Sequence, residues 1–202
     1  MIARADILLI KERYPSMKIV FCGDYYQLGP VSGPASTEAD YDNVVHHTKD
    51  FRCKCPILGK LKDDLRGMIR SGLPTREINK IGMDQLPMVS VDELRSMYSI
   101  EDYVICGTNG KKDHYTKMLG GTGDKDKYYI TENNRTYSNG QIVIADEKPP
   151  ASCEIRHAFT AHSVQGETCV SKLFIDRQTM FDPRMLYTTV SRCRYLDQLY
   201  VI

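Results

Sequence analysis

Short apolar runs alternate with helix-like segments along most of this 202-residue chain. Continuous apolar runs of this length are typical of strands that are buried on both faces. Strands that alternate with helices favour an α/β fold, in which helices flank a largely parallel sheet. We therefore expect strands at residues 18–22, 43–47, 102–107, 141–145, 171–176 and 197–202.

Apolar residues at helical spacing predict the helices between these strands. In the first helix, Ile2, Leu8 and Leu9 are expected to face inward, and Ser71-Gly72 is expected to end the second. The predicted helices cover residues 2–13, 56–70, 110–119 and 183–192.

The formal net charge of +1 shows that the protein is not a generally basic nucleic-acid coat. Any contact with nucleic acid must therefore be local. The most basic stretch runs over residues 52–80, and two interpretations of it stay open: a binding surface, or an ordinary solvated helix face.

The seven cysteines are odd in number and have no framework spacing, which predicts free thiols in a reducing, intracellular compartment. Cys22 and Cys106 stand in apolar runs and are expected to be buried. Cys53 and Cys55 are closer together than zinc ligand pairs usually are, so we expect no metal site. No apolar stretch approaches the ~18 residues that a membrane helix needs, and no signal peptide is visible.

The first motif is GDYYQLGPV, which follows the predicted strand at residues 18–22. Ligands of α/β sheets bind at the carboxyl ends of strands. Asp24 and Gln27 could therefore face a phosphate oxygen or a metal-bound water. The alternative is an ordinary turn from a strand into a linker.

The second motif lies in FTAHSVQGETCVSKLFID, where a predicted strand ends at Thr160 and a polar turn follows. The turn holds His162, Ser163 and Gln165, whose side chains can hydrogen-bond phosphate oxygens. Gly166 allows the backbone to approach a ligand closely. Taken alone, His162 would more often be a structural residue.

The third motif is MLYTTVSRCRYLDQLYVI, in which Leu186, Tyr187 and Val190 are expected to face inward. Arg192 would then stand at the helix end, where its forked guanidinium could reach a nucleotide in a facing domain. The alternative for a single arginine is a surface ion pair.

In this order, the three motifs resemble motifs III, V and VI of superfamily 1 helicases, and the resemblance is strongest to the RecD-like class. That class also includes a helicase group acting in mitochondrial and telomeric DNA maintenance. The sequence departs from the usual motif VI at Thr189, where the family has Ala. The matching residues are Gly23, Asp24, Gln27, Leu28, Pro30 and Val31 for motif III, Thr160, His162, Gln165, Gly166 and Thr168 for motif V, and Tyr187, Ser191, Arg192 and Arg194 for motif VI.

The resemblance implies a RecA-like fold of the phosphate-loop NTPase type. Residues 1–33 would be the end of a first motor domain, and residues 34–42 a linker. Residues 43–202 would be the second motor domain, with a small insertion near residues 120–140.

The resemblance also implies roles for individual residues. ATP, with Mg²⁺, would lie between two motor domains and drive movement along single-stranded DNA, with RNA as an alternative. Gln27, Arg52 and Arg192 would contact the nucleotide as catalytic residues. The predicted nucleotide-binding residues are Gly23, Asp24, Gln165, Gly166 and Glu167, and the predicted nucleic-acid-binding residues are Thr108, Thr160, His162 and Ser163.

Two parts of such a motor are missing from the sequence. The phosphate-binding loop of NTPases has the pattern G-x-x-x-x-G-K followed by Ser or Thr, and this pattern does not occur in the sequence. The Asp-Glu pairs in residues 89–93 and 142–147 come after motif III, so we expect a helix start and a strand end there rather than Mg²⁺ ligands. The chain alone is therefore predicted to be inactive. It would be a gene fragment, the second piece of a split gene, the product of a misplaced start codon, or a reduced paralogue. The alternative functions are a non-catalytic fragment that binds single-stranded nucleic acid, a fragment that complements a separate chain with the ATP-binding half, and a degenerate fragment with no activity.

Overall fold

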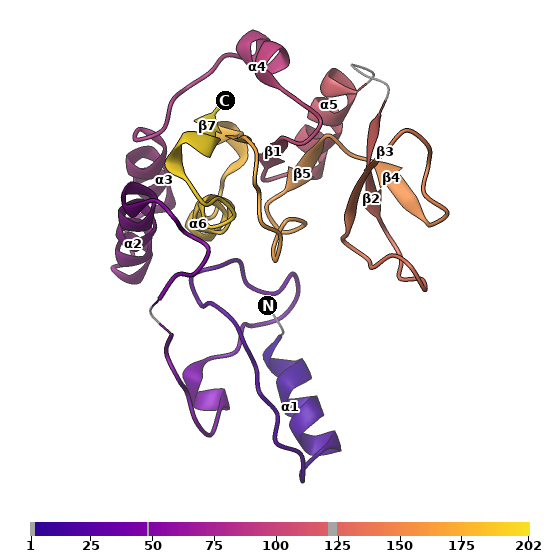
Figure 1. Ribbon diagram of the computed structural model, residues 1–202. Helices are drawn as coiled ribbons and strands as arrows, with labels where there is room; N and C mark the ends of the chain where they lie inside the picture. Colours follow the sequence, from indigo (N-terminus) through magenta and orange to yellow (C-terminus); the bar gives the residue numbers. More distant parts are fainter. Residues whose placement is uncertain (1–2, 48, 121–124) are drawn as a thin grey trace. The chain divides into compact units, whose positions relative to one another are not determined.

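The computed structural model describes residues 3–47, 49–120 and 125–202 (Figure 1). The chain divides into two compact units, Met1–Asp50 and Phe51–Ile202. The second unit begins at Phe51, whereas the second motor domain was expected to begin at residue 43.

The second unit is built on a parallel sheet, which confirms the predicted α/β class (Figure 1). Its strand order is β5-β1-β6-β7, so the first strand in the sequence lies inside the sheet. Three of the strands lie inside the expected ranges, and the fourth ends at Thr160 as predicted. Their bounds are β1 Tyr103–Cys106, β5 Ala158–Thr160, β6 Leu173–Ile175 and β7 Leu199–Val201.

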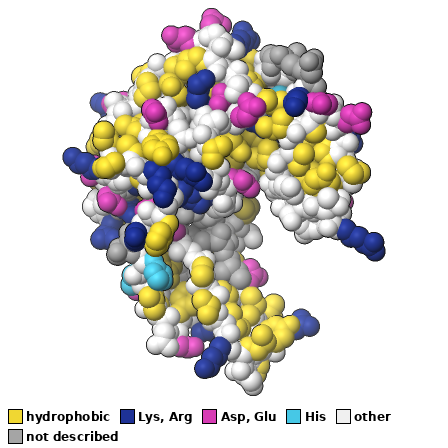
Figure 2. Space-filling model, viewed as in Figure 1, with side chains coloured by type: hydrophobic (Ala, Val, Ile, Leu, Met, Phe, Trp, Pro, Cys, Tyr) yellow, Lys and Arg dark blue, Asp and Glu magenta, His cyan; other side chains and the backbone are white. Residues whose placement is uncertain are grey.

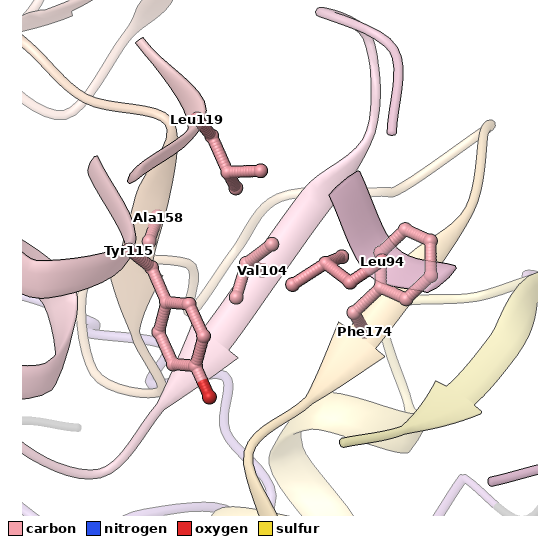
Figure 3. Packing of buried hydrophobic residues seen from close by; sticks show 6 residues of the cluster. All are labelled: Leu94, Val104, Tyr115, Leu119, Ala158 and Phe174. Atoms are coloured by element: carbon pink, nitrogen blue, oxygen red, sulfur yellow. The ribbon is translucent and has the colours of Figure 1, made fainter. Parts of the chain in front are cut away.

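Two helices, α4 (Val91–Met97) and α5 (Asn109–Leu119), supply side chains to a buried cluster on this sheet. Figure 3 shows Leu94, Tyr115 and Leu119 of these helices around residues of the sheet. The residues of the sheet in the cluster are Val104, Ala158 and Phe174. Ser90 caps α4 and forms a capping box with Glu93, which confirms the helix start expected at residues 89–93.

Three further helices pack together: α2 (Pro56–Arg70), α3 (Thr75–Met83) and α6 (Pro183–Val190). The second predicted helix has the observed bounds of α2, because Pro56 suits a first helical turn and the chain turns at Ser71 and Gly72. The inward face of α6 is confirmed, since Leu186, Tyr187 and Val190 are buried. Helix α6 ends two residues earlier than expected.

A separate antiparallel sheet has the strand order β3-β2-β4. It is formed by β2 (Asp126–Ile130), β3 (Ile142–Ala145) and β4 (Cys153–Ile155). The strand expected at residues 141–145 is therefore present, but its expected burial on both faces is wrong, since no residue of β3 is buried. Part of the expected insertion, residues 121–124, lies outside the described residues.

The first unit contains α1 (Arg4–Arg13) and the short helix η1 (Glu38–Asp40). The strands expected at residues 18–22 and 43–47 are wrong, because neither segment is in a strand. A strand requires a hydrogen-bonded neighbour, and no strand is found among the described residues of this unit. The side chains of Val20 and Val45 are 85% and 76% exposed, respectively.

The inward face expected for α1 is also wrong. Ile7 is fully buried, whereas Leu8 and Leu9 are 50% and 60% exposed. The returning chain fixes this orientation, because Arg4 donates both its backbone N–H to Pro34 and its side-chain Nε to Asp40. Ile2 lies outside the described residues.

The burial of the cysteines follows the formation of these strands. Cys106 ends β1 and is buried as expected, whereas Cys22 is exposed because its segment forms no strand. No helix within residues 3–47, 49–120 and 125–202 is both long and apolar enough to cross a membrane.

Candidate functional site

Two predicted nucleic-acid contacts lie at one edge of the parallel sheet. Strands β1 and β5 are parallel neighbours, with Cys106 opposite Thr160. Their carboxyl ends therefore meet at the same edge. Thr160 is the last residue of β5, and Thr108 follows β1 and caps α5 by accepting a hydrogen bond from the backbone N–H of Lys111. The parallel register brings these two threonines to a common edge.

The turn after β5 is shaped by its own hydrogen bonds. The Oγ of Ser163 donates to the carbonyl of Thr160 at 2.9 Å, and its backbone N–H donates to the same oxygen at 3.0 Å. This turn leaves His162 exposed. Gly166 has a φ of 104°, a conformation that side chains rarely adopt, so glycine is required there.

Arg52 connects three parts of the sequence that are far apart. Its Nε donates to the hydroxyl of Thr168 at 3.0 Å, across 116 residues. Its Nη1 donates to the carbonyl of Ser191 at 2.9 Å, across 139 residues. Arg52 therefore contacts one residue of the second motif, Thr168, and one residue of the third, Ser191.

Arg192 lies against the same segments but is only 1% exposed. Its Nε donates to the carbonyl of Thr188 at 2.9 Å, and its Nη2 donates to the hydroxyl of Ser191 at 2.7 Å. Its Nη1 donates to the carbonyl of Glu167 at a longer 3.3 Å. The two predicted catalytic arginines thus meet around residues 167–168.

Two cysteines beside this site are held as neutral thiols. Cys106 ends β1, and Cys169 follows Thr168. Burial raises the pKa of each thiol to about 12. Neither sulfur is therefore a thiolate nucleophile at neutral pH.

A second set of contacts at the sheet edge was not predicted from the sequence. The buried carboxylate of Asp176, just after β6, accepts from the hydroxyl of Thr179 at 2.7 Å. The same hydroxyl accepts from the backbone N–H of Gly107 at 2.8 Å. A polar residue directly after a buried strand was the available signal for Asp176. Nothing in the local sequence indicated the contact between Thr179 and Gly107.

The predicted residues of motif III belong to the other compact unit, Met1–Asp50. Asp24 accepts from the backbone N–H of Tyr26 at 3.0 Å and from Nε2 of Gln27 at 3.3 Å. These bonds form an Asx turn, which holds the Gln27 amide beside a carboxylate. A side chain at Gly23 would meet no atom within 4 Å, so close packing does not explain that glycine.

The basic stretch at residues 52–80 does not form one exposed surface. Lys62 is only 2% exposed, and the Nε of Arg66 donates to the hydroxyl of Tyr187 at 2.7 Å. On the face drawn in Figure 2, Lys and Arg side chains gather over the region where Figure 1 places α6. The described residues contain no group of three or more His, Cys, Asp or Glu side chains that could hold a metal ion.

Comparison with known proteins gives two negative results and one positive result. No protein-family model matches the sequence. No curated protein matches it either. Solved structures do match, and those discussed below are all Pif1 helicases.

The Bacteroides Pif1 helicase bound to single-stranded DNA matches with a TM-score of 0.70 and 15% identity, over 100% of this chain and 68% of that one. The same helicase with ADP-AlF3 and single-stranded DNA matches with a TM-score of 0.62 and 16% identity, over 89% and 60%. The Candida albicans Pif1 helicase matches with a TM-score of 0.56 and 14% identity, over 90% and 62%.

The chain therefore shares its fold with the matched parts of these solved structures. Its parallel sheet with flanking helices is that of the RecA-like domains in these neighbours. It spans 60% to 68% of the length of the three solved chains.

Proposed function

We propose that this chain is part of an ATP-dependent DNA helicase of the RecD-like class, in which ATP hydrolysis drives movement along a single strand. The supporting observation is that Arg52 contacts Thr168 and Ser191 while Arg192 contacts Glu167. These hydrogen bonds join residues that are far apart in the sequence. Replication, repair and recombination of DNA are the processes in which such a motor would act.

On the nucleotide side, Arg52 and Arg192 are proposed to contact the terminal phosphate of ATP from the second unit. Guanidinium donors suit phosphate oxygens in charge and geometry. Arg52 is half-buried, whereas Arg192 is enclosed and would have to exchange its 3.3 Å bond to Glu167 for a phosphate. Gln27, with Gly23 and Asp24, belongs to the first unit and is proposed to sense a nucleotide phosphate. Bound Mg²⁺ would neutralise phosphate charge in the intact enzyme.

On the nucleic-acid side, Thr108, Thr160, His162 and Ser163 are proposed to contact the phosphodiester backbone of single-stranded DNA. Thr108 follows β1, Thr160 ends the neighbouring parallel strand β5, and His162 is exposed in the turn after β5. Two of the matched structures, both of the Bacteroides Pif1 helicase, contain single-stranded DNA, which supports DNA as the ligand. Residues 165–167 would connect the bound DNA strand to the nucleotide.

Strand binding can be tested by fluorescence anisotropy with a labelled oligothymidine at several salt concentrations. We expect binding that weakens with salt, since phosphate contacts release counterions. His162→Ala is expected to weaken binding roughly fivefold, the equivalent of one net hydrogen bond. The matched control is His47→Ala, another exposed histidine. Equal losses in both variants would contradict the assignment.

ATP hydrolysis provides a second test. We expect the chain, with single-stranded DNA and Mg²⁺, to release phosphate from ATP no faster than a protein-free sample. The reason is that the sequence contains no phosphate-binding loop to position ATP. Hydrolysis that disappears in Arg192→Ala would refute this expectation.

The second candidate function is a non-catalytic one, which the missing phosphate loop favours. The chain would then bind single strands only, or complement a separate chain that carries the ATP-binding half. Hydrolysis that appears only after such a chain is added would support the second of these roles.

A further inference from the structure

Phe181 is an exposed aromatic residue on a fixed backbone. Its side chain is 65% exposed. Its backbone N–H donates to the carbonyl of Thr179 at 3.0 Å. The next residue, Asp182, caps α6 by accepting from the backbone N–H of Arg184 at 2.8 Å. The chain is therefore held on both sides of a ring that faces solvent.

This ring lies beside the turn from β1 into α5. A Cβ placed on Gly107 would lie 3.3 Å from Cε1 of Phe181 and 1.7 Å from the carbonyl oxygen of Thr179. Only glycine lets the two segments come this close. Gly107 immediately precedes Thr108, which is proposed above to contact the DNA backbone.

The contact between these segments is fixed by hydrogen bonds. The hydroxyl of Thr179 accepts from Gly107 and donates to the buried carboxylate of Asp176. The short helix η2 (Arg177–Thr179) is thus attached to the sheet edge directly before Phe181. A ring in such a position needs little ordering when a ligand stacks on it.

One cationic group, Lys111, also lies beside this turn. Lys111 in the first turn of α5 extends to η2, where its Nζ lies 3.4 Å from Oε1 of Gln178. An aromatic face next to cationic and hydroxyl groups matches one class of ligand, a single strand with exposed bases and charged phosphates. Double-stranded nucleic acid keeps its bases stacked on each other and offers no free face.

We propose that Phe181 stacks on one base of a single strand whose phosphates contact Thr108 and the first turn of α5. This proposal rests on the function proposed above and adds a base contact to it. Because every base has a π face, the contact is independent of sequence.

The test compares two labelled ligands of equal length: an oligothymidine and an abasic oligomer with the same phosphodiester backbone. Phe181→Ala is expected to weaken oligothymidine binding by roughly five- to 150-fold. It should leave the affinity for the abasic oligomer unchanged. Phe181→Tyr keeps the ring and should bind like the wild type, and Phe181→Leu keeps only the apolar volume and should bind weakly. The matched control is Phe51→Ala, which removes another exposed phenylalanine.

Three outcomes of this experiment would contradict the proposal. If Phe181→Ala binds oligothymidine like the wild type, or loses affinity for both ligands equally, stacking is refuted while strand binding stands. If the wild type binds neither ligand, the proposed function fails as well. If sedimentation shows a dimer that Phe181→Ala dissociates, the ring belongs to a contact between copies of the chain.

Discussion

Gly107→Ala is predicted to be among the most damaging single-methyl additions in the chain. The new Cβ would lie 1.7 Å from the carbonyl oxygen and 2.7 Å from the carbonyl carbon of Thr179. Both atoms belong to the backbone, so no side-chain rotation relieves the overlap. Gly107 is not among the glycines with a left-handed φ, so the contact alone causes the effect.

The size of the effect follows from what must move. Either the start of α5 or the helix η2 has to shift, at a cost of about 1–3 kcal/mol for overpacking. The shift breaks the 2.8 Å bond between Gly107 and Thr179 and disturbs the 2.7 Å bond to Asp176, which is only 1% exposed. A buried carboxylate that loses a partner adds about 1–3 kcal/mol. We therefore expect a loss of about 4 kcal/mol in the free energy of unfolding.

Equilibrium urea unfolding, followed by circular dichroism, measures this loss. The control is Gly110→Ala in the first turn of α5, where a Cβ would meet nothing within 4 Å. That substitution should be neutral or stabilise the protein by up to about 1 kcal/mol. A Gly107→Ala variant within about 0.5 kcal/mol of the wild type would refute the close contact between β1 and η2.

Three further predictions concern the same unit. Burial lowers the pKa of Lys127 to about 8, whereas the pKa of lysine in the unfolded chain is about 10.4. Between these two pH values the unfolded state therefore binds more protons than the folded state, and the contribution of Lys127 to stability rises with pH. Urea unfolding of the wild type and Lys127→Met should show the difference between them moving by about 3 kcal/mol in favour of lysine over that range; a constant difference would refute the shift. Ser90→Ala should cost about 1 kcal/mol in urea unfolding, because Ser90 caps α4, and a neutral result would contradict the cap. Arg66→Ala should lower the thermal midpoint because Arg66 donates to the hydroxyl of buried Tyr187, whereas exposed Lys60→Ala on the same helix should not; equal midpoints would contradict the bond.

The elements that could be predicted from the sequence carry their determinants locally. Helix α2 has Pro56 in its first turn and buried residues at helical spacing. The apolar runs at β1, β6 and β7 become buried parallel strands. The runs at residues 18–22 and 43–47 are similar in composition, but a strand depends on a neighbour that composition does not show.

The candidate site was only partly predictable for the same reason. The motifs identified Gly166 and Arg192 by type and order, and Arg52 was implied by the resemblance to helicases. The contacts of Arg52 span 116 and 139 residues, so no local spacing shows that it bonds to Thr168 and Ser191. The burial of Arg192 and the contact between Gly107 and Thr179 also depend on long-range packing.

Hydrogen–deuterium exchange of the chain with and without saturating oligothymidine tests most directly whether a single strand crosses the carboxyl edge of the parallel sheet. We predict slower exchange of the backbone amides at residues 107–111 and 160–166 in the presence of the strand. The amides of α2, in the basic stretch, should be unchanged. Binding that slows exchange in α2 and leaves residues 107–111 and 160–166 unaffected would contradict the proposed site.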